Sequence, residues 1–124
     1  MLKVSLVVLY ASDLEACFGF YEKFGLVFAK EKHGAGPEHY SARVQNIVFE
    51  LYPGPPEGAN SSRTMIGFQV PDPERLIQDL IAAAYCDESR LAAWRSQGFV
   101  IVKDPGGNRI MIEKETLSPG SIRR

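Results

Sequence analysis

The sequence has few cysteines, no excess of positive charge and no long apolar run. Cys17 and Cys86 are too few for a disulfide framework. Lys and Arg number 14 against 15 Asp and Glu, so the chain lacks the basic surface that nucleic-acid binding needs. No apolar stretch approaches the roughly 20 residues of a membrane span, and no signal-peptide cleavage motif follows Met1. The composition argues against nucleic-acid and membrane partners and predicts a cytoplasmic protein.

The chain also lacks the common short catalytic motifs. It contains no glycine-rich phosphate loop, no Ser-His-Asp order and no Cys-x-x-Cys. Asp87 and Glu88 follow Cys86, and their negative charge should raise the pKa of that thiol, which disfavours a reactive thiolate. Cys17 lies in a helical pattern, where a buried free thiol is the ordinary outcome.

A hydrophobic content of 45% is enough for a single domain that covers residues 1–124. Its first part, about residues 2–53, predicts the order β-α-β-β-β. Ser12 and Glu15 form a capping box, and Gly25 ends the helix. The first strand should be buried on both faces, with its even-numbered side chains sharing one of them. The expected elements are a helix at about 13–24 and strands at 4–10, 26–32, 40–44 and 47–52.

The second part, about residues 63–115, restarts the same order after a proline-rich linker at 54–62. Asp72 and Pro73 open its helix. Residues 85–97 show no strand alternation, so they are compatible with either a short helix or the strand that the repeat requires. The tail, 116–124, should be loose. The remaining expected strands are 64–70, 98–103 and 109–114.

Residues 99–114 predict an antiparallel hairpin with a Pro/Gly/Asn turn at 104–108, in which both glycines would supply positive φ. Alternation places Arg109, Met111 and Glu113 on one face. The turn and the strand after it resemble the signature that closes many proteins of the vicinal oxygen chelate superfamily, which includes glyoxalase, bleomycin-resistance protein and extradiol dioxygenase. The segments 9–15 and 20–26 are similar to the start and end of that family's first helix, so the resemblance covers nearly the whole chain.

The resemblance implies an α+β fold in which two βαβββ modules form a cup-shaped, curled mixed sheet with the helices outside. The family's four metal ligands would fall on Leu6, Glu50, Met65 and Met111. Only Glu50 is a usual ligand, because a thioether is a soft donor and leucine donates nothing. We therefore expect no metal cofactor at these positions. If a divalent metal is bound, its candidate ligands are Glu50, His33, His39 and Glu113.

The resemblance also implies an apolar cup with a few polar groups, which is the usual composition of a small-molecule site. Glu50 is its candidate catalytic residue, and it would either pair with Arg109 or a cationic ligand, or reach solvent at the edge. Trp94 is interpreted as a core anchor or as an aromatic wall of the cup. The predicted cup residues are Leu6, Val8, Tyr10, Glu50, Tyr52, Met65, Gln69, Trp94, Arg109 and Met111.

His33 and His39 lie at the two ends of one predicted turn. In a tight hairpin their imidazoles could share a metal or a proton, whereas an open hairpin would leave both in solvent.

The favoured function is small-molecule binding of the bleomycin-resistance type, by a homodimer that has lost most of the family's metal ligands. The alternative is a metal-dependent lyase, isomerase or dioxygenase that uses relocated ligands. A third possibility is a filled cup in a protein that serves to associate with a partner. The sequence leaves open whether the chain is an enzyme.

Overall fold

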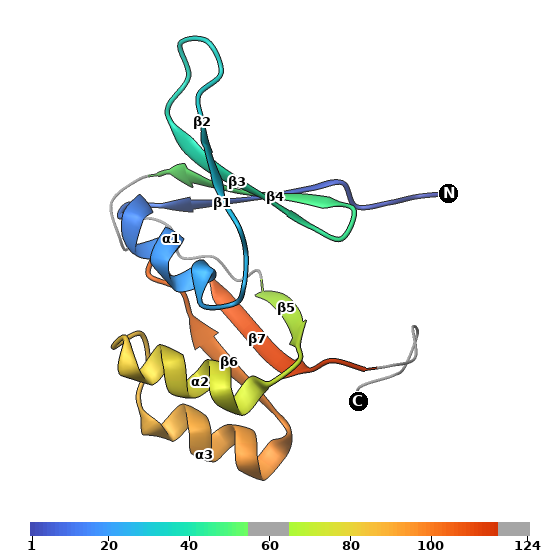
Figure 1. Ribbon diagram of the computed structural model, residues 1–124, viewed down its shortest axis with the longest axis vertical. Coiled ribbons are helices and arrows are strands. Elements are labelled where there is room, and N and C mark those ends of the chain that lie inside the picture. Colours follow the sequence, from blue (N-terminus) through green and yellow to red (C-terminus); the bar gives the residue numbers. More distant parts are fainter. Residues whose placement is uncertain (55–64, 117–124) are drawn as a thin grey trace.

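The computed structural model describes residues 1–54 and 65–116, in which the chain forms two sheets and three helices (Figure 1). The predicted linker and tail lie almost entirely outside the described residues. The helices are α1 (Leu14–Glu22), α2 (Pro73–Ala82) and α3 (Glu88–Gln97). The strands are β1 (Leu6–Ala11), β2 (Ala29–Glu31), β3 (His39–Val44), β4 (Ile47–Pro53), β5 (Met65–Val70), β6 (Phe99–Lys103) and β7 (Arg109–Lys114).

The two sheets have matching topology. Sheet A has the order β1-β4-β3-β2, and sheet B has the order β5-β7-β6. In each sheet the first strand of the module pairs in parallel with the last, and the last pairs antiparallel with the strand before it. This mixed α+β architecture is the predicted fold class.

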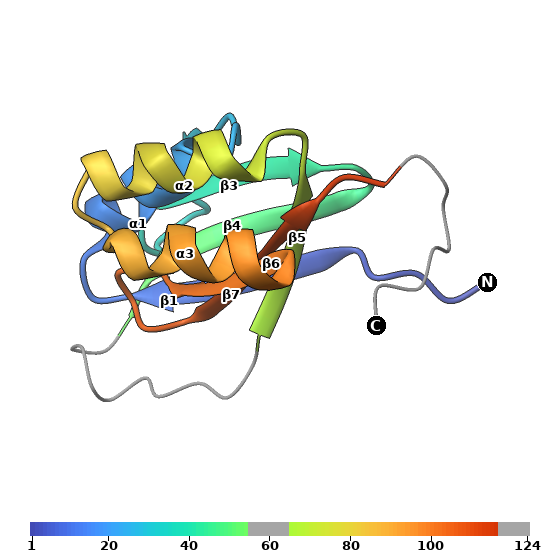
Figure 2. The same cartoon turned by 90° about the horizontal axis from the view of Figure 1, so that it is seen from below.

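The second module has a helix where the first has its short strand β2. Residues 88–97 form α3, which begins after the N-cap Asp87 and ends at Gly98, a residue with φ of 81°. The guanidinium of Arg95 on α3 donates to both carboxylate oxygens of Glu74 on α2, at 3.0 and 3.1 Å. The two helices lie side by side next to sheet B (Figure 2). The open question for residues 85–97 is therefore decided in favour of a helix.

One hydrophobic core joins both modules. It contains Phe20 and Tyr21 of α1, Leu51 of β4, Ile77 of α2 and Ile110 of β7, all of them fully buried. Every strand except β2 contributes alternate side chains to it, as strand geometry requires. The other face of each sheet is turned away from the core.

Two local predictions were wrong. The N-cap of α1 is Asp13 and not Ser12, because the Asp13 carboxylate accepts from the backbone N–H of Ala16 at 3.0 Å. Glu15 does not complete a capping box; it instead accepts from the Tyr40 hydroxyl of β3 at 2.7 Å. The strand β1 is not buried on both faces, since Leu6 is 52% exposed in the described part of the chain.

The turn between β6 and β7 is organised by Asp104, which is 4% exposed. Its carboxylate accepts from the backbone N–H of Gly106 and of Asn108, each at 2.9 Å. Gly107 has the expected positive φ, 90°, but Gly106 does not. A Cβ at Gly106 would lie 3.0 Å from the carbonyl oxygen of Tyr10, so this glycine lets the turn approach β1.

Candidate functional site

Sheet B carries a hollow of about 1070 Å³ on its open face, here called the sheet B hollow. Met65, Ile101 and Met111 supply much of its apolar lining, and Gln69 and Glu113 supply polar groups. Gly67 lies beneath Met111, whose Cε is 3.2 Å from the position a Cβ would take there. The structure thus brings together three of the predicted cup residues, Met65, Gln69 and Met111.

Two other predicted cup residues lie elsewhere. Arg109 shares its strand face with Met111 but lines a smaller hollow beside Arg90 and Cys86. Trp94 is on α3 and packs against the hydrophobic core, so it is a core anchor and does not form a wall of the sheet B hollow. Its position follows from the helix that residues 88–97 form in place of a strand.

The open face of sheet A carries the remaining predicted cup residues. Leu6, Val8 and Tyr10 of β1 pair with Val48, Glu50 and Tyr52 of β4, so all six point to the same side. None of them lines the sheet B hollow. Within one chain, therefore, the predicted cup is divided between the two sheets.

Glu50 has a partner that the sequence did not indicate. Its Oε2 lies 3.6 Å from Nε2 of His39, and its side chain is only 14% exposed. The Tyr52 ring stacks on the His39 ring with centroids 4.2 Å apart and planes 8° apart. Burial and the nearby Glu50 carboxylate raise the pKa of Tyr52, so its hydroxyl stays protonated and can donate.

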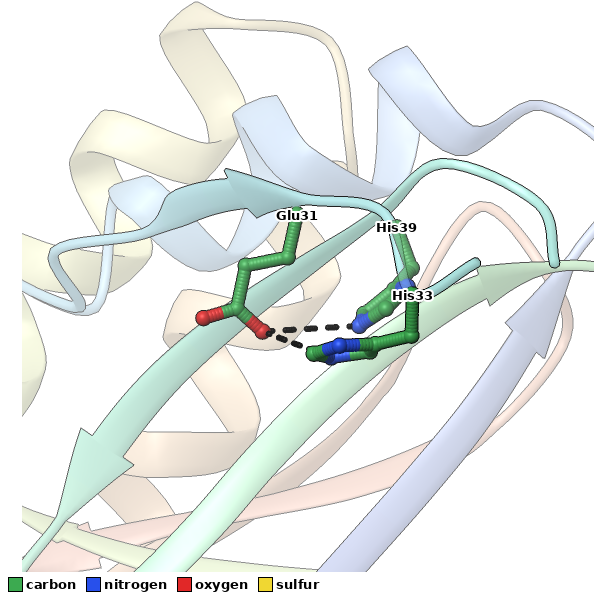
Figure 3. Close-up of side chains that lie close together, drawn as sticks. All are labelled: Glu31, His33 and His39. Carbon is green, nitrogen blue, oxygen red and sulfur yellow. Dashed lines mark ion pairs between the residues drawn. The ribbon is translucent and has the colours of Figure 1, made fainter. Parts of the chain in front are cut away.

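His33 and His39 do approach each other, with ring centroids 5.1 Å apart (Figure 3). A third residue, Glu31 of β2, joins them: its Oε1 is 3.5 Å from Nε2 of each histidine. We call these three residues the hairpin cluster. His39 is 1% exposed, whereas the His33 side chain is 71% exposed, so a fully solvated hairpin is wrong for His39.

Sequence reasoning missed Glu31, although the signal was available. Glu31 and His33 are two residues apart, and β2 pairs Glu31 directly with His39 of β3. Period-two alternation therefore predicts that the three side chains share one face of the hairpin. Glu113, the fourth proposed relocated ligand, lines the sheet B hollow and is not in the hairpin cluster.

The four positions that hold the metal in the resembling family do not fit a metal here. Leu6 and Glu50 lie on sheet A, while Met65 and Met111 line the hollow of sheet B. The set offers one carboxylate, two thioethers and an alkyl group, which is unsuited to a divalent ion of the glyoxalase type.

The model of the Glyoxalase/Bleomycin resistance protein/Dioxygenase superfamily matches residues 3–112. The chain belongs to this superfamily. Among solved structures, the fosfomycin resistance protein FosX from Mesorhizobium loti is similar with a TM-score of 0.71 and 15% identity, covering 94% of each chain. Lactoylglutathione lyase from Agrobacterium tumefaciens has a TM-score of 0.60 and 19% identity, covering 94% of this chain and 96% of its own.

A third similar structure is a possible glyoxalase from Bacillus cereus, with a TM-score of 0.66 and 18% identity over 91% of this chain and 99% of that one. None of the curated proteins matches the chain significantly. At these identities the similar structures establish the superfamily fold alone. Among the described residues, no helix combines the length and apolar character needed to cross a membrane.

Proposed function

We propose that this superfamily member binds a small organic molecule in the sheet B hollow, without a metal at the superfamily's four ligand positions. The observation that carries the proposal is the hollow itself. Its volume of about 1070 Å³ is slightly above the usual range for small-molecule sites, roughly 300–1,000 Å³, and its lining combines apolar and polar side chains in similar measure. Met65 and Met111 supply flexible side chains that adapt to a ligand's shape.

The charges in the hollow favour a ligand with a cationic group next to an apolar or aromatic body. Glu113 is 8% exposed and lines the hollow together with Glu115. With two carboxylates and no lysine or arginine among the described residues that line it, the hollow favours a cation over an anion. Gln69 and Gln97 add neutral groups that can donate or accept hydrogen bonds.

We further propose that two copies of the chain form a homodimer that covers the open faces of the sheets. Apolar side chains on these faces are largely exposed in one chain: Leu6 52%, Tyr10 48%, Met65 44% and Phe99 39%. Exposed apolar side chains on open sheet faces are typical of association surfaces. A second copy would also enclose the hollow further and exclude water from a bound ligand.

A thermal-shift panel tests the binding proposal. Metal-free bleomycin serves as the large cationic probe, and fosfomycin and S-lactoylglutathione serve as anionic probes. A ligand that binds only the folded chain stabilises it by about 2.7 kcal/mol at 100 times its Kd. We expect bleomycin to raise the melting temperature and the two anions to leave it unchanged.

The variant Met111→Trp connects any shift to the hollow, because the larger indole would occupy space in the hollow that the ligand needs. The matched control is Val27→Trp, which adds the same side chain at a position that is 86% exposed and outside the hollow. The shift should vanish in the first variant and persist in the second. A response to none of the probes, or an equal response in both variants, contradicts the proposal.

The alternative, a metal-dependent lyase, isomerase or dioxygenase, requires ligands at positions other than the superfamily's four. The hairpin cluster is such a position.

A further inference from the structure

We propose that Glu31, His33 and His39 bind one divalent transition-metal ion of the zinc class. All three ligand atoms lie within 4.8 Å of one another on the β2–β3 hairpin. Its three ligands are different residues from those at the superfamily's metal positions, which here are Leu6, Glu50, Met65 and Met111, and of these four Glu50 lies beside His39. It also stands apart from the proposed function, because none of its residues lines the sheet B hollow.

The spacing of the ligand atoms fits a shared ion better than direct hydrogen bonds. Glu31 Oε1 lies 3.5 Å from Nε2 of His33 and 3.5 Å from Nε2 of His39. Hydrogen bonds between nitrogen and oxygen are shorter, roughly 2.7–3.2 Å. A tetrahedral ion with ligands at about 2.0–2.1 Å holds neighbouring ligand atoms about 3.3–3.4 Å apart. The two distances from Glu31 are therefore close to those that a shared tetrahedral ion imposes, and the two histidines, whose ligand atoms lie within 4.8 Å, complete the set.

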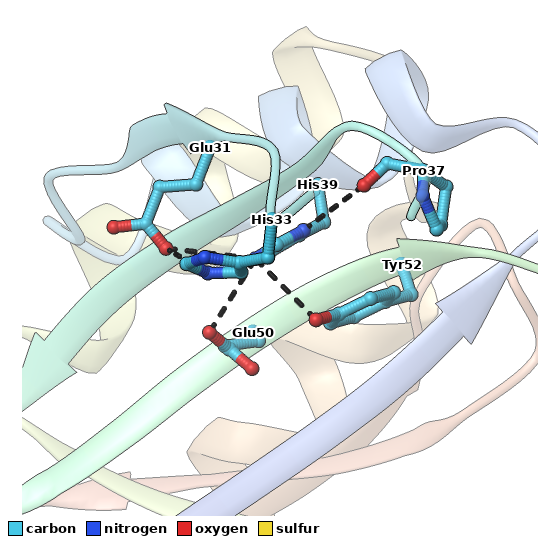
Figure 4. A network of polar contacts seen from close by, with 6 residues as sticks. All are labelled: Glu31, His33, Pro37, His39, Glu50 and Tyr52. Carbon is cyan, nitrogen blue, oxygen red and sulfur yellow. Dashed lines mark hydrogen bonds and ion pairs between the residues drawn. The ribbon is translucent and has the colours of Figure 1, made fainter. Parts of the chain in front are cut away.

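The groups around His39 hold its ring in the orientation that a metal ligand needs. Its Nδ1 lies 3.2 Å from the carbonyl oxygen of Pro37 (Figure 4). A carbonyl oxygen only accepts, so Nδ1 is the nitrogen that donates, and in the neutral ring this leaves a lone pair on Nε2. Metal-binding histidines usually donate their second ring N–H to such a partner, which sets both the tautomer and the ring orientation. The stacked Tyr52 ring holds the imidazole plane in place.

Nε2 of His39 therefore points into a group of oxygen atoms. Besides Glu31, it faces Oε2 of Glu50 at 3.6 Å and the Tyr52 hydroxyl at 3.4 Å. The ring is 1% exposed, so these protein groups take the place of water around it. Two carboxylates close to two imidazoles form a site whose negative charge favours a cation.

The donor set indicates the class of ion. Two imidazoles and one carboxylate are borderline ligands that suit zinc, nickel or cobalt, whereas magnesium and calcium prefer oxygen ligands alone. Catalytic zinc sites often have this His₂Glu set and keep the fourth position for water or a substrate atom. Glu50 and Tyr52 lie beside His39, where they can hydrogen-bond a molecule held at that fourth position.

The test uses the full chain, treated with a chelator and then dialysed free of it. Zn²⁺ is titrated by calorimetry, and Co²⁺ is titrated by visible absorption as a probe of coordination geometry. We expect one Zn²⁺ per chain and a tetrahedral Co²⁺ spectrum without the charge-transfer band of a thiolate ligand. Cys17 and Cys86 are then excluded as the source of binding.

Two variants locate the ion. His33→Ala removes a side chain that is 71% exposed, so the fold should persist, and Glu31→Gln keeps the shape of the side chain while weakening the ligand. Each should lower the affinity for Zn²⁺ by at least the roughly 10- to 100-fold that loss of a supporting partner costs. The matched control Glu38→Gln removes an exposed carboxylate from the same hairpin, outside the cluster, and should leave the affinity unchanged.

Three outcomes overturn the proposal. They are the absence of stoichiometric Zn²⁺ binding, an affinity that is equal in wild type and both variants, and a thiolate band in the Co²⁺ spectrum. The first would mean that direct polar contacts alone hold the three side chains of the cluster together. None of these results bears on ligand binding in the sheet B hollow.

Discussion

The hydroxyl of Tyr21 donates a hydrogen bond of 2.5 Å to the carboxylate of Asp104, 83 residues further along the chain. Tyr21 is on α1 in the first module, and Asp104 organises the β6–β7 turn of the second. The pKa of Tyr21 is raised by burial and by the Asp104 charge, so the hydroxyl remains a donor. Both residues are buried, and the bond connects the two modules within the core.

The hydrogen bond between Tyr21 and Asp104 predicts what happens when the Tyr21 hydroxyl is removed. Tyr21→Phe leaves Asp104 with one donor fewer inside the core, which should lower the free energy of unfolding by about 1–3 kcal/mol. Denaturant unfolding measures the loss. The control is Tyr85→Phe, whose hydroxyl is 3.4 Å from the carbonyl oxygen of Ala16, and its loss should be smaller. Equal losses in the two variants would mean that the Tyr21 hydrogen bond has no special role.

Because the thiol of Cys17 is buried, we expect the protein to lose stability in alkaline solution. Burial, and then the charge of Asp104, raise the pKa of this thiol from 9.0 to about 12. Below the unfolded value the thiol is protonated in both states, so its contribution to stability is fully present. As the pH rises from 9 towards 12 the unfolded chain ionises first, and stability falls by about 1.4 kcal/mol by pH 10.

The measurement is the free energy of unfolding at about pH 8 and pH 10 in wild type and in Cys17→Ala. The variant should lack that part of the decline, even though it is less stable at both pH values. A decline of the same size in both proteins would show that the thiol titrates normally in the folded chain.

The proposed homodimer predicts the result of light scattering. At tens of micromolar the wild type should have twice the mass of one chain, and Leu6→Lys should shift it towards the monomer. The reason is that a charge would replace an apolar side chain, now 52% exposed, that the second copy would cover. A wild-type monomer at that concentration would count against the dimer.

Much of the fold could be predicted because local patterns decide it. Alternation correctly placed Met111 on the same strand face as Arg109 and Glu113, and Asp72 with Pro73 correctly marked the start of α2. The sequence patterns gave conflicting indications of whether residues 88–97 form a helix or a strand. The repeat favoured a strand, while the N-cap Asp87 and the terminal Gly98 favoured the helix that forms.

The candidate site was harder to predict because it depends on how strands meet. The alternation within a strand predicts which side chains lie on its open face. Whether the open faces of two sheets line one hollow depends on how the two sheets lie relative to each other. Leu6 and Met111 therefore fall on different surfaces of one chain. His39 shows a second limit, since its burial comes from Tyr52, Glu50 and Glu31 on neighbouring strands.

Calorimetric titration of metal-free bleomycin into the chain, with EDTA present throughout, measures whether the sheet B hollow binds a ligand without a metal. Wild type and Val27→Trp should bind saturably and with equal affinity, while Met111→Trp should not bind. This result would place the ligand in the sheet B hollow and show that no metal is needed. Metal-independent binding in the sheet B hollow is contradicted if wild type does not bind under these conditions, or if Met111→Trp binds as tightly as the other two proteins.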